Sequence, residues 1–441
     1  MRKKGSILVG LLWCLALLSV IVIGVLHTAR MDLLVVKSYG DRIQAHYLAL
    51  AGIEKTRALL YRDAQDRSHT RKNHSGNYYD NAGEFREIPF SRGTFSIIRR
   101  GRPDEGGGIV YGVSDEESRL NVNTATGEEL TKLQNITPDT VSAILNWRGG
   151  SSSNLAAEVE YYGNLRPPCQ PRLASFLTVR ELLMVRGVNA EDLLGRDRHQ
   201  NGLLMAGEGN QFALPGSVDS QDLGWAGLLT VDSSVQNLNA AGEDRVNVQT
   251  ADEHSLAALQ GFTPQIAHAV VTYRGQHRFE SIADLLNVTP PPPTSQRGQD
   301  PALDQSDQSD NKVINEDLFL QIADDVTTVS DQSQAGAVNI NTAGLDVLIC
   351  LPGVTRELAQ SIISHRQSSG FFASTGELLK LPEMTRDLFS QIAPLITARS
   401  ETYRILCEGK INSTGVRQRI QAIVRIGLNS QQILSWREDD L

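Results

Sequence analysis

The sequence predicts an α+β protein in which a long N-terminal helix packs against a small antiparallel sheet, and an inserted all-α region of three modules interrupts that sheet. Three observations predict this fold class. An uncharged apolar run opens the chain and continues into an amphipathic stretch without a proline. A pattern that ends in arginine then occurs three times. Strand-like segments precede the first copy and follow the last.

The first part of the N-terminal helix, residues 6–26, is expected to span a membrane. Basic residues and Gly5 precede this run, and the run itself contains no charged residue. A bilayer core needs about 20 apolar residues at about 1.5 Å of helical rise each, so the run has the length of one span. Because basic flanks stay in the cytoplasm, the chain after residue 26 is expected on the far side of the membrane.

Residues 27–63 are expected to continue this helix as its amphipathic half. They contain no proline, and charged residues fall largely between apolar residues at helical spacing. The polar stretch 65–79 is expected to be a loop that follows the helix. The apolar positions of the amphipathic half are Leu33, Val36, Ile43, Tyr47, Leu50, Ile53, Leu59 and Leu60.

Three interpretations of the opening segment are open. A secretory signal peptide would have a shorter apolar core and a small-residue cleavage site, which residues 26–30 do not provide. An ordinary signal anchor fits the periodicity as well. The third interpretation is a resemblance to the leader of type IV prepilins. It rests on residues 1–5, in which basic residues precede Gly5, and on Ser6, which begins a long hydrophobic helix. This resemblance implies that a prepilin peptidase cuts between Gly5 and Ser6 and that the new terminus at Ser6 is methylated.

The sequence differs from major pilins at two positions after the leader. Ser6 stands where major pilins carry an aromatic residue, and Gly10 stands where they carry a glutamate. A carboxylate inside a membrane is costly unless it is paired, and the pilin glutamate is understood to neutralise the terminal amine of a neighbouring subunit. Because it lacks this glutamate at Gly10, the sequence resembles the minor pseudopilin K of type II secretion systems (the general secretion pathway protein K family). This resemblance implies that the chain is a tip subunit.

This resemblance extends along the whole chain and implies a function in protein export across the outer membrane. It implies a single-pass protein of the bacterial inner membrane, with its globular part in the periplasm, that joins the pseudopilus after processing. The implied partners are the other minor pseudopilins, the major pseudopilin, prepilin peptidase and exported proteins. The usual insertion of that family resembles two modules, so the three modules of this chain are a departure from it.

Length and composition limit the other functions. With 441 residues the chain can hold two or three domains beyond its anchor, and its net charge of −9 argues against general nucleic-acid binding. The sequence contains no P-loop, serine-hydrolase, zinc-protease or dinucleotide motif, so no enzyme is expected. Cys14 lies in the span, and the cysteines form no CxxC pair. Outside the cytoplasm, Cys169 and Cys407 either form a disulfide or stay buried or free, like Cys350.

Strand candidates flank the repeats on both sides. The region 84–114 contains two alternating segments around a turn rich in glycine, proline and aspartate, which predicts a hairpin. The region 399–430 contains two stronger ones, and the tail after it is polar. All four strands are expected to form one pilin-like sheet on the first helix. The candidates are residues 93–99, 108–113, 401–408 and 417–427.

The repeat predicts compact modules of about four short helices each. The shared frame is V-N-x-x-T-A, then leucines, a short break, and a second helix that ends in arginine. After each copy comes a small helix, a turn and another helix start. The copies are residues 119–148, 245–274 and 337–366, and their second parts are residues 176–194, 279–288 and 372–388. The modules are expected at residues 115–200, 228–326 and 335–398, with a disordered low-complexity loop at 289–312.

Several positions within the repeat have expected structural roles. A threonine in the shared frame is expected to cap the first helix, with at best a partial capping box. A proline fits the first turn of the second helix. The terminal arginine suits the helix dipole and is expected to hold carbonyls rather than to act in catalysis. These residues are Thr124, Thr250 and Thr342, then Pro138 and Pro264, then Arg148, Arg274 and Arg366.

The modules are helix-hairpin-helix or SAM-like, and the third supplies an alternative function. Residues 338–366 resemble the helix-hairpin-helix of membrane-anchored competence DNA receptors, in which backbone N–H groups of an L-P-G turn face a phosphate. The resemblance implies DNA contacts at Pro352, Gly353, Thr355 and Arg356, although Thr355 replaces the second glycine of that turn. Nearby acids offset the basic groups, so nucleic acid is not the expected partner and a protein-contact surface is preferred.

Two acidic runs, residues 115–117 and 439–440, could offer oxygen ligands to calcium. The resemblance to the pseudopilin K family implies calcium in the globular part. The sequence contains no EF-hand loop, so no ligand is assigned. Solvated acidic loops are the expected structure of both runs.

Overall fold

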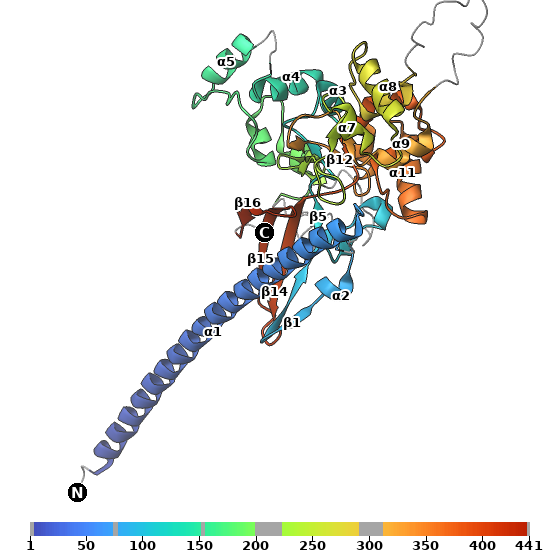
Figure 1. Ribbon diagram of the computed structural model, residues 1–441. Helices are drawn as coiled ribbons and strands as arrows, with labels where there is room; N and C mark the ends of the chain where they lie inside the picture. The colour runs from blue at the N-terminus through green and yellow to red at the C-terminus, as the bar shows by residue number, and fades with distance from the viewer. Residues whose placement is uncertain (1–3, 74–77, 151–154, 199–222, 291–311, 439–441) are drawn as a thin grey trace, which may run out of the picture.

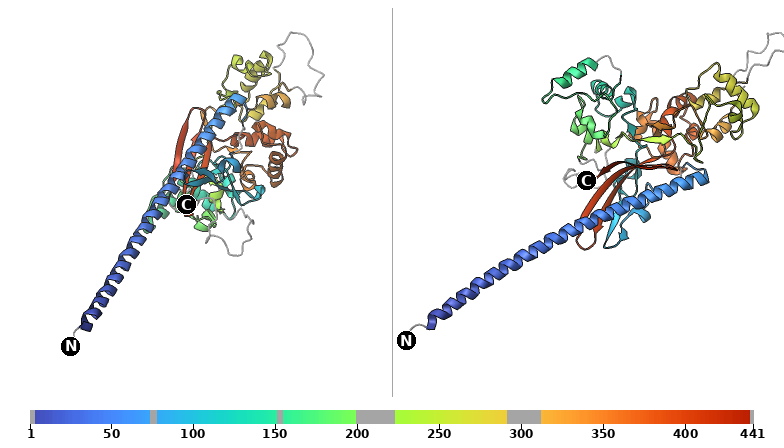
Figure 2. Two further views of the ribbon diagram at one scale, coloured as in Figure 1. Left: turned by 90° about the horizontal axis from the view of Figure 1, so that it is seen from below. Right: turned by 60° about the vertical axis from the view of Figure 1, so that its left-hand side comes forward.

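The computed structural model describes residues 4–73, 78–150, 155–198, 223–290 and 312–438, and it confirms the predicted fold class. Helix α1 (Lys4–Thr70) is continuous, and only its second half packs against the rest of the chain. In all views its first half projects away from a body that consists of one sheet and three helical modules (Figures 1 and 2). The low-complexity segment expected to be disordered lies almost entirely outside the described residues.

Helix α1 packs on the sheet through small residues. The side chains that face the sheet include Ala45 and Ala49, which are fully buried. A Cβ at Gly409 of the sheet would lie 2.7 Å from the Ala49 nitrogen, so glycine lets the strand approach the helix. The predicted apolar face is therefore partly wrong, because Ile53 and Leu60 are buried whereas most of the others are outside the core. The exposed ones are Leu33, Val36, Ile43 and Tyr47.

The helix also extends further than the expected end at residue 63. Its last turns pack under the end of the sheet, where Gln65 Nε2 donates to the Leu428 carbonyl at 2.9 Å. Arg67 is buried and forms an ion pair with Asp63 at 3.3 Å, one turn earlier. Because these contacts hold the backbone in place, the predicted loop at 65–79 begins only at Arg71.

One antiparallel sheet collects strands from both ends of the chain, as predicted, but the candidate strand at 108–113 is not part of it. Its order is β1-β2-β14-β15-β16, and β5 also pairs with β14. The expected N-terminal hairpin is reduced to two residues on each side, in strands β3 and β4, because β2 pairs with β1 and β14 instead. The polar tail is an edge strand, not a loop. The strands are β1 (Ile88–Phe90), β2 (Gly93–Ile97), β3 (Arg99–Arg100), β4 (Ile109–Val110), β5 (Ser114–Asp115), β14 (Thr402–Ile411), β15 (Arg417–Ile426) and β16 (Gln431–Arg437).

Each module consists of two helical hairpins, as the repeat predicts. The first hairpin joins two α-helices, and the second joins a 3-10 helix to an α-helix. Module 1 has α3 (Gly127–Thr131), α4 (Pro138–Trp147), η2 (Val179–Met184) and α6 (Ala190–Leu194), with α5 (Leu155–Gly163) as an addition. Module 2 has α7 (Glu253–Ala257), α8 (Pro264–Arg274), η5 (Ile282–Asn287) and α9 (Glu316–Ile322). Module 3 has α10 (Leu345–Cys350), α11 (Arg356–Ser368), η6 (Thr375–Lys380) and α12 (Arg386–Ile392).

A two-residue parallel strand pair closes each module, so the insertion is not purely helical. The first strand is Leu-Asn in module 1 and Val-Asn in modules 2 and 3, and an apolar residue followed by threonine forms the second strand. Because β7 closes module 1, this module ends near residue 230 rather than at 200, and module 2 begins near 245 rather than at 228. The pairs are β6 (Leu120–Asn121) with β7 (Leu229–Thr230), β9 (Val246–Asn247) with β10 (Val326–Thr327), and β12 (Val338–Asn339) with β13 (Ile396–Thr397).

Modules 2 and 3 share a single hydrophobic core, whereas module 1 has a core of its own. The rings of Phe319 in module 2 and Phe389 in module 3 meet edge to face, with centroids 5.9 Å apart. The core of module 1 surrounds Trp147 and Trp225 and receives only Cys350 from module 3. Modules 2 and 3 are therefore one packing unit.

The helix caps differ from those expected. The N-cap of the first helix of each module lies two residues after the predicted threonine, and these N-caps are Thr126, Asp252 and Gly344. The shift arises because the shared frame forms a turn of its own, in which the Asn121 side chain accepts from the Asn123 backbone N–H at 2.9 Å. The expected prolines are confirmed, since each occupies the first position of its helix.

The terminal arginines hold carbonyls, as expected, but those carbonyls belong to the shared frame and not to their own helices. Nη1 of Arg148 donates to the Val122 carbonyl at 2.6 Å, and the other two repeat this bond. Arg366 additionally contacts Asp104, in the tip of the β3–β4 hairpin, at 2.9 Å. This one side chain therefore closes module 3 and ties it to the sheet region.

Replacement of Arg366 by alanine is expected to lower the free energy of unfolding by about 2–3 kcal/mol, because two carbonyls and a carboxylate lose a buried donor. Urea unfolding of the full chain in detergent micelles, followed by circular dichroism, measures the change. Arg386→Ala is the control, because its ion pair with Glu316 is about half exposed and is expected to contribute about 0.5 kcal/mol or less. Equal losses in the two variants would contradict the assigned role.

Candidate functional site

The exposed half of helix α1 is the first candidate site. Residues 8–39 are exposed along the whole helix surface, and the most apolar window has a mean hydropathy of 2.8 with none of it buried in the chain. This is the one helix in the described residues that is long and apolar enough to cross a membrane. Gly5 and Ser6 lie in its first turn, and a Cβ at Gly10 would meet no atom within 4 Å. Packing within the chain therefore does not require glycine at position 10.

The turn of module 3 that resembles the DNA-binding hairpin is the second candidate. Its glycine, Gly353, has a φ of +70°, and a Cβ there would lie 2.7 Å from a methyl group of Leu388. The equivalent residues of the other modules, Asn135 and Gly261, also have positive φ. The glycine thus serves the turn and its packing on the next helix, so its presence alone does not indicate phosphate binding.

Thr355, which replaces the second glycine of that turn, is the N-cap of α11. Its hydroxyl accepts from the Leu358 N–H at 3.3 Å, as Thr137 and Thr263 do for the equivalent helices. Arg356 follows it and is exposed. The structure therefore places all four proposed DNA contacts on one turn, but one of the N–H groups at the helix start is already occupied by the cap.

The run Asp115–Glu117 is not a solvated loop, and that expectation is wrong. The three residues are at most 4% exposed and lie where strand β5 leaves the sheet. Asp115 accepts from the Asn339 amide at 3.0 Å and from the hydroxyls of Thr342 and Ser400. It thereby joins the sheet to module 3, and the threonine expected to cap a helix is one of its donors.

The next two acids make separate connections. Glu116 contacts Nε of Arg404 at 2.7 Å and accepts from the Thr230 hydroxyl, which belongs to the closing strand of module 1. Glu117 accepts from the backbone N–H groups of Ser234 and Thr402, each at 3.1 Å. We call these three residues the junction acids. Sequence analysis named these residues as an acidic run but missed their connecting role, although their position between a strand and the first repeat was a usable indication.

The junction acids differ in charge state. Burial raises the pKa of Glu116, but the Arg404 and Arg119 guanidinium groups outweigh it and leave that pKa below its usual value. Burial raises the pKa of Glu117 well above its usual range, and the Asp115 carboxylate raises it further. Burial raises the pKa of Asp115 as well, but the donors around it offset part of this effect. Burial therefore favours retention of one proton by the Asp115–Glu117 pair.

The junction acids do not fit a calcium site. Their oxygens accept from donors on different elements and do not converge on one point, and the described residues contain no group of three or more metal-ligating side chains. The second acidic run, 439–440, lies outside the described residues.

The described cysteines are free, so the structure does not form the Cys169–Cys407 disulfide. Cys407 is buried in the sheet beside Gly52 of α1, and Cys169 lies in module 1. Burial raises the pKa of Cys350 to about 12, which leaves it an unreactive thiol at neutral pH.

These features define the class of protein: an α+β chain with one helix that could anchor it in a membrane and with repeated helical hairpins. A family model described as "Helix-hairpin-helix motif" matches residues 242–290 and 333–397, in modules 2 and 3. This match covers less than half of the chain, and module 1 lies outside it.

The comparisons with known proteins also give three similar proteins. The bovine (Bos taurus) endonuclease/exonuclease/phosphatase family domain-containing protein 1 is 27% identical over 37% of this chain and 30% of its own length. An uncharacterized protein of Neisseria meningitidis serogroup B is 34% identical over 18% of this chain and 10% of its own length. The chain thus spans less than a third of either relative. Among solved structures, the GspK-GspI-GspJ complex of the enterotoxigenic Escherichia coli type 2 secretion system contains a similar chain, with 11% identity, a TM-score of 0.45, and coverage of 91% of this chain and 98% of that one.

The raised pKa of Glu117 predicts that stability falls as pH rises. The folded state keeps a proton that the unfolded state releases above its pKa of about 4.3. The stabilisation is complete below that value and is lost as pH rises through the folded pKa. Over that window the free energy of unfolding is expected to decline by at most about 1.4 kcal/mol per pH unit.

Glu117→Gln imitates the protonated acid and is expected to flatten this decline. Chemical unfolding at a series of pH values measures it, and Glu128→Gln, at an exposed position of α3, is the control that should keep the wild-type slope. Parallel profiles for the wild type and Glu117→Gln would refute the assignment.

Proposed function

We propose that the chain is a minor pseudopilin of a type II secretion system, a tip subunit that takes part in pseudopilus assembly and in protein export across the outer membrane. The observation that carries this proposal is helix α1, whose exposed apolar half continues without a break into a half that supports a sheet. A helix with no partner within its own chain needs an apolar environment. A membrane supplies it before assembly, and the helical core of a filament supplies it afterwards.

The head of the helix supports a position at the tip. Gly5 and Ser6 resemble a prepilin cleavage site, which would leave Ser6 as a methylated terminus. Gly10 offers no carboxylate to the terminal amine of a subunit above it, and its surroundings leave room for a side chain. A subunit without this group can end a filament but cannot accept a further subunit by that contact.

The helical modules are the contact surfaces in this proposal. They lie at the end of α1 away from the apolar half (Figure 1), so in a single-pass inner-membrane protein they would stand in the periplasm. There they would meet other minor pseudopilins, the major pseudopilin or exported proteins. The role is structural rather than enzymatic.

Gly5→Leu is expected to block processing, because a bulky side chain at the residue before the cut does not fit a peptidase that selects glycine. Mass spectrometry of the N-terminus measures this, with a mature chain that begins at methylated Ser6 expected only for the wild type. Gly24→Leu changes a glycine inside the same helix at a position with open space around it, and it should be processed normally. A wild-type chain that still begins at Met1 would refute the proposal.

DNA binding is the second candidate, favoured by the helix-hairpin-helix match over modules 2 and 3. Module 3 cannot be tested as an isolated fragment, because its core is shared with module 2. The full chain in detergent micelles is therefore the sample for a mobility-shift assay with duplex DNA.

If the chain is a pseudopilin, no shift that weakens steeply with salt is expected. A DNA receptor would give such a shift, because phosphate contacts release counterions. Arg356→Ala would then abolish it, whereas Arg92→Ala, at an exposed position in the turn between β1 and β2, would not.

A further inference from the structure

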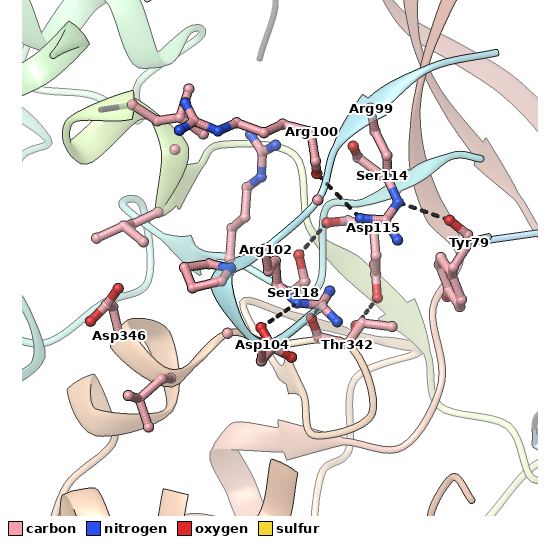
Figure 3. Close-up of a pocket in the computed structure, with 18 of the residues that line it drawn as sticks. Tyr79, Arg99, Arg100, Arg102, Asp104, Ser114, Asp115, Ser118, Thr342 and Asp346 are labelled. Atoms are coloured by element: carbon pink, nitrogen blue, oxygen red, sulfur yellow. Dashed lines mark hydrogen bonds and ion pairs between the residues drawn. The ribbon is translucent and has the colours of Figure 1, made fainter. Parts of the chain in front are cut away.

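A cavity of about 630 Å³ lies between the β3–β4 hairpin, module 1 and module 3. Figure 3 shows side chains of the hairpin, of the loop after β5 and of module 3 around it, among them Arg102, Ser118 and Asp346. This volume is in the range of ligand pockets, about 300–1,000 Å³. The lining residues extend along the chain from Tyr79 to Leu406, so the packing of the inserted modules beside the hairpin creates the cavity.

The described wall is rich in positive charge. Six arginines but only three aspartates line the cavity. Part of this charge is neutralised within the hairpin, where Arg102 contacts Asp104 at 3.2 Å. Three guanidinium groups have little or no such compensation: Arg119 and Arg404 share one carboxylate, and Arg356 forms no ion pair with the described residues.

The strongest indication of a ligand is the environment of Arg119. Its Nη1 is 3.8 Å from the Glu116 carboxylate, which already contacts Nε of Arg404 at 2.7 Å. That Nη1 atom is buried and has no hydrogen-bond acceptor in the described structure. A buried guanidinium with an unused donor requires an explanation, and an anion in the adjacent cavity supplies one.

The rest of the wall distinguishes among anions. Apolar side chains line the cavity beside the arginines, among them Ile98, Ile363 and Leu406. A phosphate has no apolar part to place against them. A carboxylate on an apolar body satisfies both kinds of wall, because arginine pairs with carboxylates through parallel hydrogen bonds.

We propose that this cavity binds an acidic peptide segment of a partner protein, with a carboxylate at Arg119 and its apolar neighbours against the aliphatic wall. The site is independent of whether the chain is a filament subunit. Because its walls come from the sheet region and from modules 1 and 3, a bound peptide links parts of the fold that also meet through the junction acids and through the Arg366–Asp104 ion pair.

Isothermal titration calorimetry on the full chain in detergent micelles tests the proposal. The probes are the peptide acetyl-Leu-Glu-Leu-Glu-amide, its glutamine counterpart acetyl-Leu-Gln-Leu-Gln-amide, 4-phenylbutyrate and inorganic phosphate. Saturable binding is expected for the glutamate peptide and not for the glutamine peptide. Binding of phosphate alone, of 4-phenylbutyrate alone, or of both peptides equally would overturn the proposal, as would no binding at all.

Arg119→Gln is expected to weaken binding of the glutamate peptide at least tenfold. Because this residue is buried and could be needed for folding, a second variant acts from the exposed side of the wall. Gln360→Glu places a negative charge at an exposed cavity position on α11 and is expected to weaken binding of the glutamate peptide by a similar factor. Gln321→Glu makes the same change on the surface of module 2 and should bind as the wild type does. If the Gln360→Glu variant binds the glutamate peptide with wild-type affinity, the proposed site is refuted.

Discussion

The ties made by Asp115, Glu116 and Glu117 determine how the rest of the body is arranged. A sheet that is interrupted by three modules must let the chain leave and return at neighbouring points. Strand β5 ends at Asp115, which pairs with Tyr403 of β14, so the exit and the return lie side by side. Each junction acid then binds a different part of what was inserted: Asp115 binds module 3, Glu116 binds the end of module 1, and Glu117 binds the linker after it. Burial makes these acids costly unless every oxygen is engaged, which favours one arrangement of the modules.

Elements with a regular period could be predicted from the sequence. The helix of the N-terminal segment, the long strands β14 and β15, and the prolines that open α4 and α8 follow from local patterns. The packing face of α1 could not be predicted from hydrophobicity. The helix approaches the sheet closely through alanine and glycine, whereas larger apolar residues such as Ile43 and Tyr47, within the packed half, are exposed. The closing strands β7, β10 and β13 have two residues each, too few to show a period.

The candidate sites were predicted unevenly for a related reason. The proposed cleavage site and the hairpin turn of module 3 each consist of residues that follow one another in the sequence. A sequence motif can therefore identify each of them. The junction acids depend on partners far away, since the Ser400 hydroxyl that donates to Asp115 is 285 residues later. An isolated run of acids is usually solvated, and only the fold brings the donors to it. The same holds for Arg119. The lack of an acceptor for its Nη1 atom can be recognised only from the three-dimensional structure, in which Arg404 lies beside it.

The junction and the helix are connected by a continuous set of contacts. Glu116 binds Arg404, which belongs to β14, and β14 carries the glycine that approaches Ala49 of α1. Modules 2 and 3 form one packing unit, so module 1 is the part whose position depends most on Glu116 and Thr230. A partner that binds between modules 1 and 3 therefore lies beside the same strand that packs on helix α1. If that helix is built into a filament, β14 contacts both the filament helix and the Glu116 carboxylate that orients the arginines of the cavity.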